Sequence, residues 1–361
     1  SAVALRKLLI PPAAQPGESF DERQARVREA EQEYWRKATV FSETLLGPVA
    51  GDLKAKRLLI VPDGALQYIS FAALPIPARG DDVRPLMLEY EISLQPSASI
   101  LAMLRSRVDK PADKAIAVFA DPVFELDDSR FETGPRQTLA ANPPRDATME
   151  RALRDVNISW NTGHIPRLLA SREEARAITA LTPFSTNFKA IDFEANKAAF
   201  TSLDLSQFRI IHIATHGILD SKHPELSGLL LSRFDKDGRP KEGFLRLDDI
   251  YNLSLSATMV VLSACNTGLG KDVRGEGLVG LVHGFMYAGT SRVVASLWKV
   301  DDDATAQLMT HFYREMFQAG KSPAAALRAA QIEMWEQKRW RSPYFWAAFV
   351  LHGDYEGRVN D

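Results

Sequence analysis

The 361-residue sequence contains a single cysteine, Cys265, so no disulfide bond can form within the chain. A zinc site made of four cysteines is excluded for the same reason. So little cysteine is typical of proteins from a reducing compartment, and we therefore expect a cytoplasmic location. A lone cysteine is either a small buried core residue or a reactive thiol. Its neighbours in the sequence have to decide between these two possibilities.

Long apolar runs and blocks of one charge are missing as well. The 44 basic and 46 acidic residues give a formal net charge of -2, and no cluster of Lys and Arg indicates direct binding to nucleic acid. No apolar run approaches the roughly 18 residues of a membrane span, and the first residues do not form a signal peptide. Since the sequence starts with Ser rather than Met, we expect a piece of a longer protein.

The first part of the chain, residues 1–54, is predicted to be helical. Apolar residues recur at helical spacing between Glu22 and Leu46, and Gly47 then offers a helix stop. One interpretation is an amphipathic helix that packs on the main domain. The other is the end of a helical-repeat region, although no 34-residue repeat is visible in the sequence.

The middle of the chain contains short apolar runs typical of buried strands, at residues 57–61 and 115–119. Pro62, Asp63 and Gly64 predict a turn after the first of them. Residues 121–166 show weak periodicity and are predicted to form a long surface loop. The sequence from Ser171 to Glu174 fits a capping box that opens a helix.

The last half of the sequence alternates between predicted strands and helices. Apolar runs at residues 209–214, 258–263, 291–297 and 347–352 predict strands. Helices are predicted between them, one behind the acidic run that begins at Asp301 and another behind Ser322 and Pro323. This alternation predicts an α/β fold with a mostly parallel central sheet that is covered on both faces.

Two of these predicted strands are followed directly by reactive side chains. His216 comes two residues after the strand at 209–214, and Cys265 comes two residues after the strand at 258–263. Catalytic groups in open α/β sheets gather beyond the carboxyl ends of the strands. If the two strands are neighbours, His216 and Cys265 share one edge of the sheet. Spacing alone also fits a packing cysteine and a His-Gly turn, as well as unrelated Cys/His enzymes.

A Cys/His pair would have a definite chemical use at such an edge. An imidazole favours the reactive thiolate form of a nearby cysteine and can protonate a leaving amine. Backbone N–H groups stabilise the negative charge that develops on the attacked carbonyl oxygen. Gly217 and Cys265 are the natural donors, since glycine lets the backbone approach a substrate closely.

Several long motifs resemble the CHAT domain, a family related to caspases, separases and gingipains. They include HIATHG at 212–217, VLSACNTG at 261–268, a long stretch at 275–305 and SPAAALRAAQ at 322–331. Upstream, the stretches at 57–75 and 88–101 fit the same pattern. The similarity covers roughly residues 40 to 352. The Gln-Ala-Cys-Arg-Gly signature of animal caspases is absent, which favours the CHAT branch.

The resemblance implies a caspase-type α/β/α sandwich and a cysteine endopeptidase with His216 and Cys265 as its dyad. It implies that backbone N–H groups of Gly217 and Cys265 form the oxyanion hole. Residues 55–185 would form an inactive, caspase-like first half, and residues 186–361 the catalytic half. The His and Cys of such enzymes can lie too far apart for a resting ion pair, so His216 is expected to act mainly on the leaving group.

The same resemblance implies how such an enzyme is used. Its substrate is a specific protein, and its activity is switched on by a regulatory protein or by a fused TPR-type repeat region. Bacterial relatives of this type act in defence or cell-death pathways. No cofactor is required for the chemistry, and neither nucleic acid nor a membrane is an expected partner.

Acidic residues near the predicted dyad are candidates for the substrate pocket. Asp302 aligns with an acidic residue that reads a basic side chain in separases, and a carboxylate there favours Arg or Lys. The alternative is that Asp301, Asp302 and Asp303 simply stabilise a helix N-terminus. Asp220 either lines the pocket or fixes the loop after His216.

Other functions were weighed against the peptidase. Residues 275–280 spell Gly-x-Gly-x-x-Gly but do not directly follow a strand, which argues against a dinucleotide site. His212, His223 and His283 are not accompanied by a set of metal ligands, so no metal is expected. A catalytically silent caspase-like scaffold and a Cys/His acyltransferase are the remaining alternatives. The presence of His216, Gly217 and Cys265 together argues against the scaffold.

Overall fold

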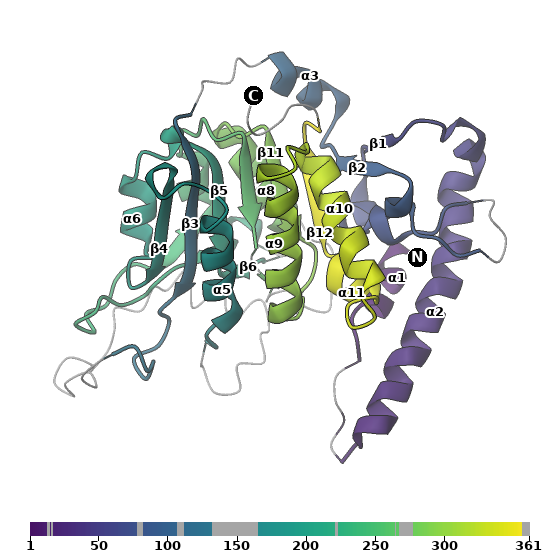
Figure 1. Cartoon of the computed structure of the whole chain (residues 1–361), viewed down its shortest axis with the longest axis horizontal. Coiled ribbons are helices and arrows are strands. Elements are labelled where there is room, and N and C mark those ends of the chain that lie inside the picture. The colour runs from purple at the N-terminus through teal and green to yellow at the C-terminus, as the bar shows by residue number, and fades with distance from the viewer. Residues whose placement is uncertain are drawn as a thin grey trace.

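The computed structural model describes residues 1–12, 15, 17–77, 82–106, 112–131, 165–220, 223–263, 265–266 and 277–355. Its centre is an eight-stranded sheet in which all neighbouring pairs but one are parallel (Figure 1). The strands follow one another across the sheet in the order β1 (Arg57–Ile60), β2 (Glu91–Leu94), β12 (Phe349–Gly353), β11 (Arg292–Ser296), β9 (Met259–Leu262), β5 (Phe208–Ala214), β3 (Lys114–Pro122) and β4 (Asn187–Asp192).

The single antiparallel pair, β11 with β12, divides the sheet into two parallel blocks. One block contains β1, β2 and β12, and the other contains β11, β9, β5, β3 and β4. The strands of the larger block consist mainly of buried apolar residues, and every residue of β9 and β11 is buried. Such continuous apolar runs are expected where helices cover both faces of a sheet.

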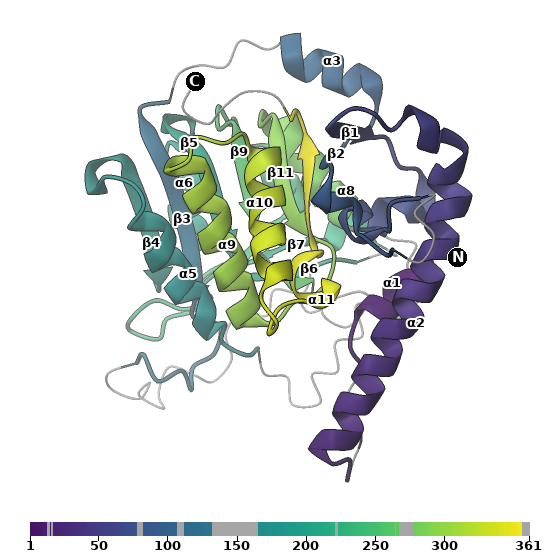
Figure 2. The same ribbon diagram turned by 45° about the vertical axis from the view of Figure 1, so that its right-hand side comes forward.

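Helices cover both faces of the sheet. Three of them, α5 (Leu169–Thr179), α9 (Asp302–Phe317) and α10 (Pro323–Glu336), lie side by side over one face (Figures 1 and 2). The crossovers through α6 (Lys197–Ser202), α7 (Leu247–Tyr251) and α8 (Gly277–Ala288) step across the sheet in the opposite direction. Because crossovers are right-handed, these helices belong on the other face. The predicted α/β class with a mostly parallel central sheet is therefore confirmed.

The remaining helices lie outside this sandwich. The longest, α2 (Phe20–Leu46), begins with a capping box between Ser19 and Glu22 and ends at Gly47 as predicted. It runs beside the β1 and β2 edge of the molecule (Figure 2). The others are short: α1 (Ala2–Leu9), α3 (Ala98–Ser106) and α11 (Pro343–Trp346). No helix among the described residues is both long enough and apolar enough to cross a membrane.

The structure also contains a second sheet, which has four strands and follows the carboxyl end of β5. Its order is β10 (Cys265–Asn266), β6 (His216–Ile218), β7 (Gly228–Leu230) and β8 (Phe244–Arg246). β5 leads into β6 through a single residue, Thr215, so the small sheet continues directly from the carboxyl end of the central strand. The sequence pattern did not predict this sheet, because its strands are only two or three residues long.

One predicted helix start is wrong. Helix α5 begins at Leu169 and follows Leu168, so Ser171 lies inside the first turn. The Ser171 hydroxyl donates to the Leu168 carbonyl instead of capping the helix. The Glu174 carboxylate points to His212, 3.0 Å away, rather than back to the helix N-terminus. Most of the predicted 121–166 loop, residues 132–164, lies outside the described part of the chain.

The boundary near residue 185 between the two predicted halves stays a prediction. The large sheet takes strands from both sides of it, because β3 lies between β4 and β5. Both parts also contribute to one continuous apolar core.

Candidate active site

The larger parallel block gathers polar residues at one edge of the sheet. Asp192 ends β4, Asp121 lies near the end of β3, and His216 follows β5. Cys265 follows β9, and Asp302 follows β11. β5 and β9 are paired in parallel, so the condition under which His216 and Cys265 share one edge of the sheet is met. The carboxyl ends of parallel strands are where α/β proteins commonly place their functional groups.

His216 is buried, with 1% of its surface exposed, and is held on two sides. Its Nε2 atom lies 2.7 Å from the Pro166 carbonyl oxygen. Since a carbonyl only accepts, Nε2 carries the proton in this contact. The Phe124 ring packs against the imidazole with its centroid 5.1 Å away. Nδ1 has no hydrogen-bond partner among the described residues, so it is the ring atom left for chemistry.

Cys265 lies in the strand next to His216. In the parallel pair of β10 and β6, Cys265 is in register with His216 and Asn266 with Gly217. Paired strands lie about 4.8 Å apart, so the two backbones place the thiol-bearing and imidazole-bearing residues side by side. The side chain of Cys265 lies outside the described part of the structure. The catalytic roles of both residues stay predictions.

Burial sets the electrostatic state of His216. Removal from water lowers the pKa of its imidazole to about 4, the Pro166 carbonyl opposes this shift, and the positive charge of Lys299 adds to it. At neutral pH the ring is therefore uncharged. An uncharged imidazole is the form that can accept a proton.

We expect this shift to make stability depend on pH. In the unfolded chain a histidine has a pKa near 6.5, so between pH 6.5 and 4 only the unfolded state takes up the proton. The free energy of unfolding should therefore fall as the pH drops through this range, by about 3 kcal/mol from His216 alone. Urea unfolding of the native chain and a His216→Gln variant at pH 7 and pH 4 measures it. An equal drop in both proteins would contradict the prediction.

Asp302, the main candidate for the substrate pocket, lies in the first turn of α9. Asp301 caps this helix, since its Oδ1 accepts the Ala304 N–H at 3.1 Å. Asp302 is half-buried, and this burial raises its pKa against the opposing charge of Lys299. The charge of Lys299 therefore acts on the pKa of both Asp302 and His216.

Asp220, the second candidate, is buried and shapes the loop after β6. Its Oδ1 accepts the His223 N–H at 2.9 Å, and its own N–H donates to Ser227 Oγ at 3.0 Å. The start of α8 presses on the same loop. A Cβ atom at Gly277 would lie 3.0 Å from Leu219 Cβ and 3.1 Å from Ser227 Oγ. These contacts give Asp220 a structural use, and a role in the pocket stays a prediction.

The three histidines considered as metal ligands lie in different parts of the fold, with His212 in β5, His223 after β6 and His283 in α8. His212 is fully buried, with Nδ1 2.9 Å from the Tyr313 hydroxyl and Nε2 3.0 Å from Glu174. His223 is partly exposed and lies 3.3 Å from Glu225. Within the described part of the chain, no group of three or more His, Cys, Asp and Glu residues is arranged to hold a metal ion. Gly275 and Glu276 of the Gly-x-Gly-x-x-Gly motif lie outside that part.

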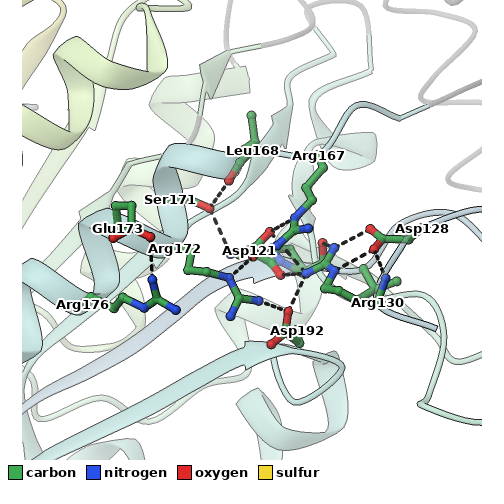
Figure 3. Close-up of polar contacts among 12 residues, drawn as sticks. Asp121, Asp128, Arg130, Arg167, Leu168, Ser171, Arg172, Glu173, Arg176 and Asp192 are labelled. Carbon is green, nitrogen blue, oxygen red and sulfur yellow. Dashed lines mark hydrogen bonds and ion pairs between the residues drawn. The ribbon is translucent and has the colours of Figure 1, made fainter. Parts of the chain in front are cut away.

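A buried cluster of ion pairs, which the sequence analysis missed, lies next to the Pro166 contact. Asp121 is its centre and is fully buried. Arg130, Arg167 and Arg172 surround this carboxylate, and Asp192 and Asp128 complete the cluster (Figure 3). Three positive and three negative side chains therefore balance. The only sequence signal is an aspartate near the end of a buried strand, which by itself is unremarkable.

Comparison with known proteins shows which family the sequence matches. The CHAT domain family matches residues 36–354. Tetratricopeptide repeat protein 28 of Mus musculus is 33% identical over 113 residues, and its Homo sapiens counterpart is 31% identical over the same length. These alignments cover 31% of this chain, which spans about 4% of the length of those relatives.

Two solved structures resemble the fold at low identity. The Saccharomyces cerevisiae separase–securin complex has a TM-score of 0.45 and 14% identity, covering 95% of this chain and 18% of that one. The Arg-specific cysteine proteinase gingipain R has a TM-score of 0.46 and 11% identity, covering 88% of this chain and 67% of that one. The family match extends over most of the sequence. The chain therefore belongs to the CHAT domain family.

Proposed function

We propose that the protein is a cysteine endopeptidase in which Cys265 is the nucleophile and His216 the acid/base. One observation carries the proposal: β10 and β6 place Cys265 and His216 in register. The orientation of His216 supports it, because the Pro166 contact leaves Nδ1 available. Membership of the CHAT family, which the sequence relates to caspase-like peptidases, supports it further.

The chemistry would proceed through an acyl-thioester. As Cys265 Sγ attacks the peptide carbonyl carbon, its proton passes to His216 Nδ1. The C–N bond then breaks, and the leaving amine takes that proton. Water hydrolyses the thioester, which releases the carboxyl product and restores the thiol. Backbone N–H groups of Gly217 and Cys265 would stabilise the oxyanion. No cofactor takes part in these steps.

We also propose that Asp302 selects substrates with Arg or Lys before the cleaved bond. Its carboxylate is half-buried, and a partly desolvated carboxylate pairs strongly with a guanidinium or ammonium group. Nothing in the geometry of Asp220 favours it over Asp302, because its Oδ1 already holds the His223 N–H.

Replacing Asp302 with Asn is expected to lower kcat/KM for Arg and Lys peptides by about 10- to 100-fold, since charge-assisted hydrogen bonds contribute about 1.5–3 kcal/mol. Peptides with Leu at the same position should change little. Initial rates on matched peptides measure the ratio. Asp303→Asn is the control, because Asp303 is the neighbouring exposed carboxylate. An unchanged preference in Asp302→Asn would remove this idea.

The wider setting is proposed from family membership. The relatives that match over part of this chain are named tetratricopeptide repeat proteins, which supports control by a TPR-type repeat region or a regulatory protein. We propose that residues 55–185 correspond to an inactive caspase-like half and residues 186–361 to the catalytic half. A specific protein substrate in a defence or cell-death pathway fits this type of enzyme.

Labelling by peptide chloromethyl ketones tests the proposed function. The thiolate of Cys265 displaces chloride and forms a thioether, so intact mass shows one adduct per chain. We expect labelling that is faster with peptides ending in Arg or Lys than with those ending in Asp or Leu. Because the chain has one cysteine, the site is unambiguous. Rapid labelling after unfolding together with none in the native state, even with a repeat-region partner added, would favour the silent scaffold.

A further inference from the structure

The Pro166 carbonyl that contacts His216 belongs to a short segment, residues 165–168. Each of the other three residues in this segment makes a hydrogen bond to another part of the chain, and these bonds are called ties below. The Ile165 N–H donates to Glu125 Oε1 at 3.0 Å. Arg167 binds the Asp121 carboxylate. The Leu168 carbonyl accepts the Ser171 hydroxyl at 2.6 Å, and Ser171 Oγ in turn accepts the Asp121 N–H at 3.1 Å. Two of these three ties lead to Asp121.

The contact between Arg167 and Asp121 is the strongest of these ties. Arg167 Nε donates to Oδ1 at 2.8 Å, and Nη2 donates to Oδ2 at 2.6 Å. Such a two-bond pair fixes orientation as well as distance. Asp121 is fully buried, so water does not compete for its carboxylate. The pair therefore anchors the backbone next to Pro166 firmly to the end of β3.

The other two arginines tie the carboxylate to a different part of the fold. Arg172 donates from Nε to Asp121 Oδ2 at 2.7 Å and also pairs with Asp192 (Figure 3). Arg130 bridges the Asp121 carbonyl at 2.6 Å and Asp192 Oδ1 at 2.8 Å. Because Arg172 lies in α5, these contacts join α5, β3 and β4, and none of them is made to residues 165–168.

Backbone conformation at the centre of the cluster is also unusual. Asp121 has a φ of 48° and Asp192 a φ of 56°, and they are the two non-glycine residues with positive φ in the described ranges. Left-handed backbone at a non-glycine residue costs free energy and persists where the surrounding contacts hold it. Both residues lie at the ends of neighbouring parallel strands, and β3, which contains Asp121, pairs with the strand that leads to His216.

We propose that Asp121, acting through Arg167, is a positioning residue for His216. The pair holds the Pro166 carbonyl at the point where it accepts the Nε2 proton. The ring is thereby fixed in the tautomer and orientation that leave Nδ1 for the neighbouring Cys265. The catalytic consequence rests on the proposed peptidase function, whereas the effect on the imidazole does not.

The test compares two arginine variants that each remove one contact with Asp121. Arg167→Met releases the Pro166 segment, and Arg172→Met leaves it attached. In Arg167→Met we expect kcat for peptide hydrolysis to fall about 10- to 100-fold with little change in KM, because a small misplacement of a catalytic group has effects of this size. In Arg172→Met, kcat should fall by less than about threefold. A fall of this size is expected from a general loss of rigidity. Arg176→Met, which removes only an exposed pair with Glu173, should behave like the native chain.

A second readout does not depend on peptidase activity. Nitrogen NMR of chains labelled at their seven histidines distinguishes a protonated from a bare ring nitrogen, and His216→Gln assigns the signal. The native chain and Arg172→Met should show a His216 Nε2–H that exchanges slowly with water. Arg167→Met should lose this slow exchange. Arg167→Lys, which keeps the charge but not the two-bond geometry, should lose it in part and serves where Arg167→Met does not fold.

The outcomes separate the two proposals. Retention of the slowly exchanging Nε2–H in Arg167→Met, or its equal loss in Arg172→Met, overturns the positioning role. Selective loss in Arg167→Met supports that role even if the chain cleaves no peptide, in which case only the peptidase proposal fails. A kcat that is unchanged in Arg167→Met, in a chain that does cleave peptides, also overturns it.

Discussion

Replacing Cys265 with Ala is expected to reduce peptide hydrolysis by at least about 10⁴-fold, to the background of the assay. No other thiol exists in the chain to take over its role. His216→Ala should be slower than the native chain by about 10²- to 10⁴-fold, which is the usual contribution of a general acid or base. Both rates are measured with a fluorogenic peptide, which is first selected as one that the native chain cleaves.

The double variant tests whether the two residues act as one unit. Catalytic groups that share a step give strongly non-additive effects, so Cys265→Ala with His216→Ala should be no slower than Cys265→Ala alone. His223→Ala is the matched control, because His223 is partly exposed and lies on the loop after β6. Substantial hydrolysis by folded Cys265→Ala would rule out the proposed mechanism.

Asp121→Asn is expected to produce a large loss of stability. The substitution keeps the size of the side chain, and asparagine tolerates the left-handed backbone found at this position. It removes the negative charge at the centre of a buried cluster and leaves Arg167 and Arg172 without their shared partner. Breaking one member of a buried ion pair costs about 3–5 kcal/mol, and we expect the free energy of unfolding to fall by that amount.

Urea unfolding at pH 7 measures this loss. Glu173 and Arg176 form an exposed ion pair within α5. Glu173→Gln weakens this pair and should lower the free energy of unfolding by less than about 1 kcal/mol. A loss in Asp121→Asn as small as in this control would mean that the arginines are compensated by other groups. The comparison also gives the stability background against which the Arg167 variants are judged.

The main elements of the fold were predictable because each carries its own local pattern. β9 and β11 are short apolar runs, and α9 and α10 open on Asp301 and Ser322 with side-chain caps as predicted. The capping box predicted at Ser171 does not form, because α5 begins at Leu169. Ser171 has the right spacing to Glu174 for a capping box. In the folded chain, however, the Glu174 carboxylate is buried and contacts His212 instead. Sequence spacing does not reveal such a tertiary partner.

The surroundings of His216 were not predictable in the same way. The Pro166 contact uses a backbone carbonyl, which every residue has, so no side-chain pattern marks it. Asp121 and Arg167 are separated by 46 positions in the chain, and each alone is an ordinary charged residue. Only the parallel order of β4, β3 and β5 brings them to the same edge. His216 and Cys265 could be proposed from the sequence because each follows a strong strand signal by two residues.

During synthesis, β1 and β2 leave the ribosome long before β12, the strand that joins them to the rest of the sheet. The hydrogen bond from the Ser93 hydroxyl to the Gly353 carbonyl cannot form before Gly353 has been synthesised. The same holds for the bond from the Arg6 side chain to the Leu297 carbonyl. Contacts between such distant parts of a chain form slowly, and unpaired strand edges are prone to associate with other chains in the meantime. The native sheet can therefore close only when β12 has emerged, so a nascent chain that ends before β12 should remain dependent on chaperones.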